Sequence, residues 1–197
     1  MELPAPLPRV LDVPTAPEVD RSPALSLLAR PGDGGIRTRK IAILVADGIE
    51  GGPIAGLVSA LVGAGAVPRL VGSRLGRCTA ADGTAFEADA SMENSPNVLF
   101  DALVLPDGLA ALESLTQDGH TMEFVKEQYR HCKTILAFGA SQALLAEAGI
   151  PMTLPDGSPD PGLILAEAKD AADASRAFIA AAGMHRHLER ETDPPMV

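Results

Sequence analysis

Three short stretches of the sequence place polar side chains at turns where catalytic groups are often held. They are Ala46-Asp47-Gly48-Ile49-Glu50, Leu105-Pro106-Asp107-Gly108 and Phe138-Gly139-Ala140-Ser141-Gln142. Each follows an apolar run without alternation, which predicts a strand buried on both faces of a parallel sheet. Ligands and catalytic groups of such sheets lie at the carboxyl ends of the strands, so these three loops are the candidate site.

Ser141 is the candidate nucleophile. The run from Gly139 to Ala143 nearly matches G-x-S-x-G, in which a serine on a sharp strand-to-helix turn attacks an acyl group. Candidate partners follow in the order Ser, Asp, His: Asp156 or Asp160, then His185 or His187. The interpretation we favour is that Ser141 caps the helix expected over 141–148, because chain order alone produces many chance triads.

The other reactive side chains have simpler explanations. Glu50 begins an expected helix, whose N-terminus attracts a carboxylate whether or not that carboxylate does chemistry. Cys132 precedes a strand and fits a small buried hydrophobe, and we expect no redox role for Cys78. His185 and His187 form the only close histidine pair, and side chains two residues apart on a helix diverge, so we expect no metal site.

Strands and helices alternate along the chain from residue 39 onward. Helical spacing is clear in one set of apolar residues: Ile54, Leu57, Val58, Leu61 and Val62. We expect strands at 41–45, 66–71, 102–105, 134–138 and 163–165, helices at 108–116, 119–131, 141–148 and 169–182, and a hairpin over 78–88. This alternation predicts an α/β fold, with a mostly parallel central sheet between two helical layers.

The N-terminal stretch 1–38 differs from the rest because it holds 7 of the 17 prolines. Proline removes amide donors and favours extended backbone, so we expect an arm or linker here. Within it, residues 22–29 have the pattern of a short helix with Leu25 and Leu28 on one face. The expected domain covers 39–190, and 191–197 form a tail.

Composition limits the classes of function. The chain has 197 residues, enough for one α/β domain, and 46% of them are apolar. A formal charge of −10 opposes binding to nucleic acid. No apolar run approaches the roughly 20 residues of a membrane span, and the N-terminus lacks a secretory signal pattern. Two cysteines without a CxxC motif suit a reducing compartment, so we expect a cytoplasmic protein.

Three motifs resemble the ThiJ/PfpI superfamily, which is related to class I glutamine amidotransferases. They are ADGIE (46–50), FDALVLPDG (100–108) and ILAFGASQALLAEAGI (135–150), and the similarity covers about residues 39–183. The resemblance implies a flavodoxin-like three-layer sandwich. In this superfamily a cysteine nucleophile usually occupies the third turn, often followed by histidine, and a glutamate from the first loop assists it.

Matching those motifs to this chain implies a site without the nucleophile and the histidine of the superfamily. Gly139 falls where the cysteine belongs and Ala140 where the histidine belongs, while Glu50 falls on the glutamate. Neither glycine nor alanine supplies a nucleophile or a base. Asp107 stands beside Gly108 where the superfamily tends to have glycine, which places a negative charge near the former oxyanion site. With Ser141, these residues form a vestigial site without a catalytic residue.

Residues 22–52 resemble the junction at which large-subunit catalases pass from the haem-binding core into an appended C-terminal domain. Such domains are similar in lacking the cysteine. The resemblance implies a structural or assembly role, with a catalase haem core or other copies of the chain as partner. Haem and the breakdown of hydrogen peroxide belong to that core. This chain should bind no cofactor, because its sole tyrosine, Tyr129, falls on an expected helix and no barrel precedes it.

Two other functions stay open from the sequence. One is a small hydrolase or glyoxalase/deglycase of the superfamily that uses a displaced residue, and the missing nucleophile disfavours it. The other is a stress chaperone that binds unfolded proteins through exposed apolar surface.

Overall fold

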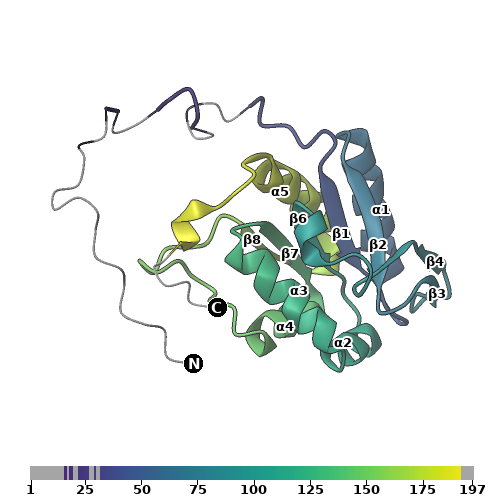
Figure 1. Cartoon of the computed structure of the whole chain (residues 1–197). Coiled ribbons are helices and arrows are strands. Elements are labelled where there is room, and N and C mark those ends of the chain that lie inside the picture. The colour runs from purple at the N-terminus through teal and green to yellow at the C-terminus, as the bar shows by residue number, and fades with distance from the viewer. Residues whose placement is uncertain (1–15, 17, 20–21, 27–28, 30–31, 192–197) are drawn as a thin grey trace. The chain divides into compact units, whose positions relative to one another are not determined.

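A computed structural model describes residues 16, 18–19, 22–26, 29 and 32–191. The chain divides into two compact units, and the second, which begins at Asp33, contains all the helices and strands of the described residues. Its main sheet has six strands in the order β5-β2-β1-β6-β7-β8 (Figure 1). Their bounds are β5 Ala90–Ser91, β2 Val67–Gly72, β1 Lys40–Leu44, β6 Ala102–Leu105, β7 Thr134–Phe138 and β8 Leu163–Ala166.

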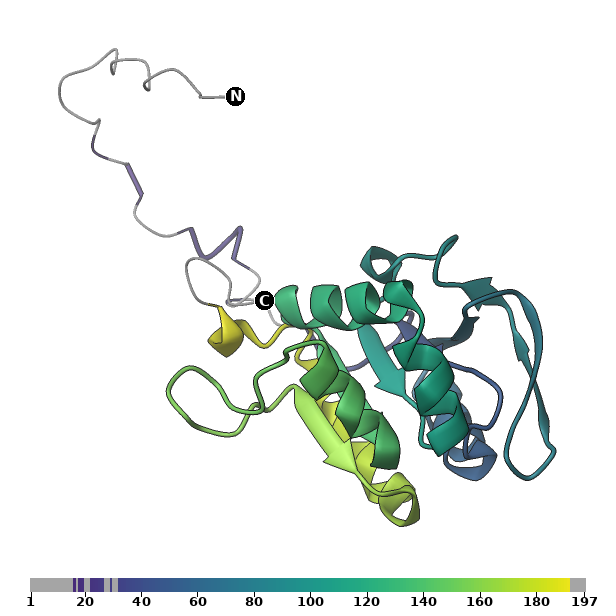
Figure 2. The same ribbon diagram turned by 90° about the horizontal axis from the view of Figure 1, so that it is seen from below.

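Every pairing in this sheet is parallel, as the continuous apolar runs predict. Two helices pack on one face: α1 (Gly51–Gly63) and α5 (Ala171–Gly183). Three helices pack on the other: α2 (Leu109–Thr116), α3 (Gly119–Arg130) and α4 (Gln142–Glu147). The layers are visible in Figure 2. The fold is therefore the expected flavodoxin-like three-layer sandwich.

The two faces of the sheet belong to two separate apolar cores because successive strand residues point to opposite sides. On β1, Ile41 and Ile43 pack beneath α1 and α5, while Ala42 and Leu44 pack beneath the other three helices. All four residues are fully buried. A central strand of this kind needs apolar residues at consecutive positions, which is the pattern that the sequence shows.

A two-stranded antiparallel hairpin stands beside the main sheet, as predicted. Its strands are β3 (Gly76–Thr79) and β4 (Ala85–Ala88), with the turn at Asp82-Gly83 between them. Strand β5 was not predicted. It has two residues and pairs only with β2, so its position depends on a neighbouring strand rather than on its own sequence pattern.

The start of the folded unit lies earlier than the expected boundary at residue 39. Ile36 is 1% exposed and belongs to the core under α1 and α5. The Thr38 amide donates to the Gly65 carbonyl at 2.8 Å, and Arg39 Nη1 lies 2.8 Å from His185 Nδ1. Residues 33–38 are thus part of the unit and not of a linker.

The short helix expected over 22–29 is not seen in the described part of that stretch. Residues 23–25 form a turn, in which the Leu25 amide donates to the Ser22 carbonyl at 3.1 Å. Leu27 and Leu28 lie outside the described residues, as do 192–197 of the expected tail.

We predict that a chain that begins at Asp33 is more stable than a chain that begins at Arg39. The shorter chain lacks Ile36, and loss of a buried isoleucine side chain costs about 2–5 kcal/mol. For a domain of this size that corresponds to a Tm lower by at least about 4 °C. Thermal unfolding of the two truncated chains measures the difference. Equal Tm values would show that Ile36 contributes nothing to the core.

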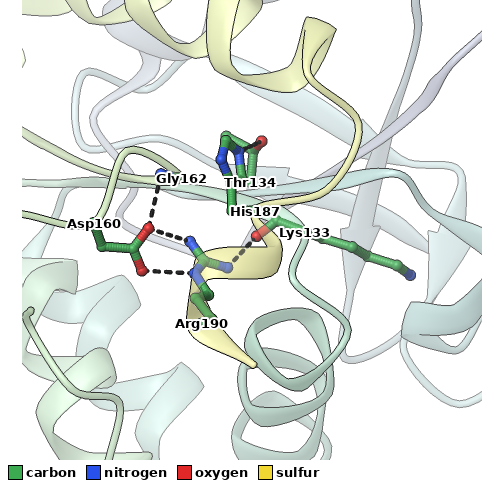
Figure 3. Close-up of polar contacts among 6 residues, drawn as sticks. All are labelled: Lys133, Thr134, Asp160, Gly162, His187 and Arg190. Carbon is green, nitrogen blue, oxygen red and sulfur yellow. Dashed lines mark hydrogen bonds and ion pairs between the residues drawn. The ribbon is translucent and has the colours of Figure 1, made fainter. Parts of the chain in front are cut away.

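A buried ion pair holds the C-terminal end of the unit against the sheet (Figure 3). Arg190, in the short 3-10 helix η4 (Leu188–Arg190), donates from Nε to Asp160 Oδ2 at 2.6 Å and from Nη2 to Asp160 Oδ1 at 3.1 Å. Its Nη1 donates to the Lys133 carbonyl at 2.6 Å, and the guanidinium lies 4.5 Å from the centre of the Tyr129 ring. Both charged side chains are almost fully buried. We call this set, with His187 beside it, the C-terminal clasp.

His187 packs into the clasp as a buried ring. Its Nε2 lies 2.9 Å from the Thr134 hydroxyl, and its backbone amide donates to the Cys132 carbonyl at 2.8 Å. Gly162 lies so close to the His187 ring and to Arg190 that a Cβ there would overlap both. Burial, and after it the charge of Arg190, lowers the pKa of His187. The folded state therefore favours the neutral ring.

We predict that stability falls as the pH drops below about 6.5, the ordinary pKa of histidine in an unfolded chain. In that range His187 binds a proton in the unfolded chain more readily than in the folded chain. A lower pH therefore favours unfolding. His187→Gln, which does not titrate, should flatten the dependence when unfolding by urea is measured from pH 5 to 7. An unaltered slope in His187→Gln would contradict the prediction.

Candidate functional site

The three candidate loops meet at the carboxyl ends of β1, β6 and β7. The chain leaves β1 toward β2 on one side and later returns to β6 on the other, so the loops after β1 and β6 flank the point where the strand order reverses. Ligand sites of open α/β sheets lie at such points. The Glu50 amide donates to the Asp107 carbonyl at 2.9 Å, and the Ala140 amide donates to the Asp107 carboxylate at 2.8 Å. The structure thus brings the predicted site residues together.

Gly139, in the turn that follows β7, has the backbone of a sharp strand-to-helix turn. Its φ is +45°, in the left-handed region that favours glycine. A Cβ at this position would overlap the Asp107 carboxylate. A side chain at position 139 and the observed Asp107 side chain therefore exclude each other, and the carboxylate fills the space that a nucleophile would need.

Asp107 holds this position through two backbone amides. Its Oδ1 accepts from the Gly108 amide and from the Ala140 amide, each at 2.8 Å. Two amides that point at one carboxylate oxygen form the kind of donor pair that stabilises negative charge on oxygen. The sequence places Asp107 near this point but does not show that its carboxylate occupies the donor pair.

Ser141 is fully buried, and its hydroxyl donates to the Pro106 carbonyl. The expectation that its side chain caps helix α4 is wrong, because the hydroxyl makes no hydrogen bond with the helix. The backbone turn places Ser141 in helical geometry, where the hydroxyl meets the neighbouring loop instead of the first amides of the helix. This hydrogen bond joins the loop after β7 to the loop after β6.

The structure does not assemble a triad around Ser141. His187 contacts Thr134, the first residue of β7, whereas Ser141 follows the last, so the two lie at opposite ends of a five-residue strand. Five strand residues span roughly 16 Å. The other candidate partners are engaged elsewhere: Asp160 with Arg190, Asp156 with Ser158, and His185 with Arg39.

Glu50 occupies the N-cap position of α1 and is exposed, and its side chain makes no capping hydrogen bond. A carboxylate at this end of a helix is favoured by the helix dipole alone. Its main-chain amide binds the Asp107 carbonyl, as described above, so Glu50 joins two of the three loops through its backbone.

Neither cysteine is placed for thiolate chemistry. Cys78 and Cys132 are both buried, and burial raises the pKa of each thiol. At Cys78 the charge of Asp47 raises the pKa further. Reactive cysteines need a lowered pKa. Burial of Cys132 agrees with the packing role predicted for it. Within the described residues, no three His, Cys, Asp or Glu side chains form a group that could hold a metal ion.

A family model described as "DJ-1/PfpI family" matches residues 39–153, which include all three loops and the strands that carry them. The chain belongs to the DJ-1/PfpI family. This finding agrees with the resemblance carried by the motifs around Glu50, Asp107 and Gly139.

Sequence relatives of this DJ-1/PfpI chain are named as catalases. "Catalase HPII" of Pseudomonas putida is 36% identical over 189 residues, which are 96% of this chain and 25% of that protein. "Catalase C" of Rhizobium meliloti is 34% identical over 186 residues, or 94% of this chain and 25% of that protein. The chain thus spans about a quarter of the length of these relatives, as expected from its resemblance to an appended catalase domain.

Solved structures share the DJ-1/PfpI fold at low sequence identity. A two-domain protein of Anabaena variabilis with dj-1/thij/pfpi-like and ferritin-like domains has a TM-score of 0.67 and 22% identity, over 74% of this chain and 50% of that one. Drosophila melanogaster DJ-1beta has a TM-score of 0.63 and 17% identity, over 75% of this chain and 94% of that one. In the described part of this chain, no helix is long and apolar enough to cross a membrane.

Proposed function

We propose that this DJ-1/PfpI chain is a non-catalytic domain of a haem catalase, with a structural or assembly role in packing against the haem core. Its similarity to proteins named as catalases over almost its whole length supports this assignment. In this proposal the core supplies the haem and breaks down hydrogen peroxide, and this chain contributes stability or subunit contacts. Its two free, buried cysteines suit the cytoplasm, where we place it.

The observation that carries the non-catalytic role is the Asp107 carboxylate beside Gly139. Covalent catalysis in this loop would need a nucleophile at the turn and free amides to receive the developing oxyanion. Position 139 has no side chain, and the amides of Gly108 and Ala140 already bind Asp107. The site therefore lacks both the attacking group and the vacant donors.

The test of the assembly role uses the native protein, captured from its source cells with an antibody raised against this chain. We expect the captured protein to show a haem Soret band and to release oxygen from peroxide, with the haem on the same polypeptide or on a firmly bound one. Intact-mass measurement distinguishes these two arrangements. A captured protein without haem would contradict the proposal.

The isolated chain should neither bind haem in a defined site nor decompose peroxide. Tyr129 is the sole tyrosine. Its ring lies under the Arg190 guanidinium, and burial raises its pKa, which disfavours the phenolate that a haem ligand would require. We expect titration with haemin to give no stoichiometric Soret shift, and an oxygen electrode to record no release beyond that of haemin alone. Stoichiometric binding with turnover would overturn this prediction.

A hydrolase that uses Ser141 is the alternative to exclude. We predict that serine-directed covalent probes leave Ser141 unlabelled in mass spectra, because its hydroxyl is buried and bound to the Pro106 carbonyl. Ser141→Ala should lower the free energy of unfolding by about 1 kcal/mol through loss of that hydrogen bond. Labelling of Ser141, together with an esterase activity lost in Ser141→Ala, would favour the hydrolase.

A further inference from the structure

Exposed apolar side chains gather at the edge of the main sheet that lies opposite the candidate site. All strands of this sheet are parallel, so their first residues share one edge, which we call the amino edge. Six large apolar side chains at this edge are each between 39% and 69% exposed: Val62, Val67, Val98, Leu99, Met184 and Leu188. Exposed apolar groups that gather on one face of a domain mark an interaction surface.

These side chains border neighbouring strands. Val67 is the first residue of β2, and Val98 lies in a short 3-10 helix that ends shortly before β6 begins. Leu188 belongs to η4, whose Arg190 donates to the Lys133 carbonyl directly before β7 (Figure 3). Strands β2, β1, β6 and β7 are consecutive in the sheet, so the surface extends over roughly 14 Å across them.

Positive charge is concentrated among these apolar side chains. Arg39 Nη1 lies 2.8 Å from His185 Nδ1, and Arg186 Nη1 donates to the His185 carbonyl at 3.5 Å. Burial, and after it the charges of Arg186 and Arg39, lower the pKa of His185; Lys133 lowers it further, and Asp101 opposes them. In residues 33–191, no ion pair involves Arg39, Lys133 or Arg186. Positive charge therefore exceeds negative charge here, although the whole chain has a formal charge of −10.

The chain enters the folded unit at this same edge. The Thr38 amide donates to the Gly65 carbonyl, two residues before β2. A Cβ at Gly183, the last residue of α5, would overlap the Gly34 carbonyl, so this part of the chain lies against the end of α5. Residues 22–52 resemble the junction with the haem core in large-subunit catalases. In the proposed catalase, the connection to the core therefore arrives at the amino edge.

We propose that the amino edge is the surface that packs against the haem core, through apolar contacts and through a carboxylate of the core that lies beside Arg39 and Arg186. This inference rests on the proposed function and adds the docking face and the chemistry of the partner surface. Opposite charges that meet across an interface fix its orientation, and arginine is enriched in such interfaces. In this arrangement the carboxyl ends of the strands, with the loop around Asp107, face away from the core.

The test is maleimide labelling of single introduced cysteines, compared between the captured haem protein and this chain alone. Val98→Cys and Met184→Cys probe the amino edge, and Leu109→Cys, at a 79% exposed site beyond the carboxyl end of β6, is the matched control. We expect the first two to react at least about tenfold more slowly in the haem protein, because an interface excludes water and reagent. Leu109→Cys should react equally in both, and mass spectra of the modified peptides identify each labelled site.

A charge reversal tests the carboxylate of the partner. Arg186→Glu places a negative charge where the proposal expects one on the core, and like charges across an interface oppose contact. In the haem protein, Val98→Cys should therefore react at least about tenfold faster when Arg186→Glu is also present. Arg77→Glu, at an exposed site on β3, is the matched charge change and should leave the rate unchanged. An equal rate with Arg186→Glu would contradict the pairing with a carboxylate.

The docking proposal fails if either amino-edge cysteine reacts equally fast in the chain alone and in a captured protein that carries haem. Protection of Leu109→Cys in place of Val98→Cys would assign docking to the opposite edge. Protection of the amino edge in the chain alone, with the mass of a dimer in light scattering, would assign this edge to a second copy. A captured protein without haem would instead contradict the proposed function, so the two failures are distinguishable.

Discussion

Replacing Arg190 with methionine should lower the free energy of unfolding by about 3–5 kcal/mol, because it leaves the buried Asp160 carboxylate without its counter-charge. The side chains of Arg190 and Asp160 are 1% and 0% exposed, so water does not replace the lost hydrogen bonds. The change also frees the Lys133 carbonyl, to which Arg190 donates at 2.6 Å. Unfolding by urea, followed by circular dichroism, measures the loss.

The matched control is the surface ion pair between Arg69 and Asp89, whose side chains are 44% and 45% exposed. Arg69→Met should cost no more than about 1 kcal/mol, since exposed pairs contribute little. The double variant Asp160→Leu with Arg190→Met should be less destabilised than Arg190→Met alone, because it leaves no unpaired buried charge. Equal losses in Arg190→Met and Arg69→Met would show that the C-terminal clasp does not stabilise the fold.

Gly139→Ala should lower the free energy of unfolding by about 2.5–5 kcal/mol. About 1–2 kcal/mol of this comes from placing a Cβ in left-handed backbone. The remainder, about 1.5–3 kcal/mol, comes from driving the Asp107 carboxylate off the amides of Gly108 and Ala140, since hydrogen bonds to charged groups contribute that much. Denaturant unfolding again measures the change.

Two further variants resolve these contributions. Gly149 also has a positive φ, +73°, but open space where a Cβ would stand, so Gly149→Ala should cost only the backbone term of about 1–2 kcal/mol. In a chain that already carries Asp107→Ala, Gly139→Ala should lower the free energy of unfolding by the backbone term alone. The two positions are then coupled by about 2 kcal/mol. Additive effects of the two substitutions would mean that Asp107 does not occupy the space beside Gly139.

These predictions describe a turn whose backbone is tight and which has no side chain at its apex. Gly139 has a left-handed φ, which any other residue at this position would also have to adopt. In this chain the residue is glycine, which adopts a positive φ without steric penalty because it has no Cβ. The amides of Gly108 and Ala140 bind the Asp107 carboxylate of the same molecule, so these hydrogen bonds contribute to packing between the loops after β6 and β7.

The order of strands and helices could be predicted from the sequence because each main element carries its own local signal. The run Ile41 to Val45 is apolar at every position, as a strand buried on both faces requires. The helical spacing of Ile54, Leu57, Val58, Leu61 and Val62 predicted the packed face of α1 in large part. Ile54, Leu57 and Leu61 are buried and Val58 is partly buried, whereas Val62 is 58% exposed. The family motifs then placed Glu50, Asp107 and Gly139 at three neighbouring strand ends, where the structure has them.

Features that depend on contacts between distant segments could not be read from local patterns. Strand β5 exists only through its pairing with β2, and Ile36 joins the core although it belongs to a glycine- and proline-rich stretch. The C-terminal clasp joins Asp160 to Arg190 across 30 positions. Nothing in the spacing of those two residues distinguishes them from exposed charges, because burial of a charge is a property of the packed molecule.

The sequence by itself determined that this chain is an α/β domain and that position 139 has no side chain with which to react. Only the tertiary structure decided what fills that position. A carboxylate selects its partners by distance and direction, and the Ala140 amide lies 33 residues from Asp107 along the chain. Because folding brings the loops after β6 and β7 together, Asp107 meets both amides and occupies the space beside Gly139.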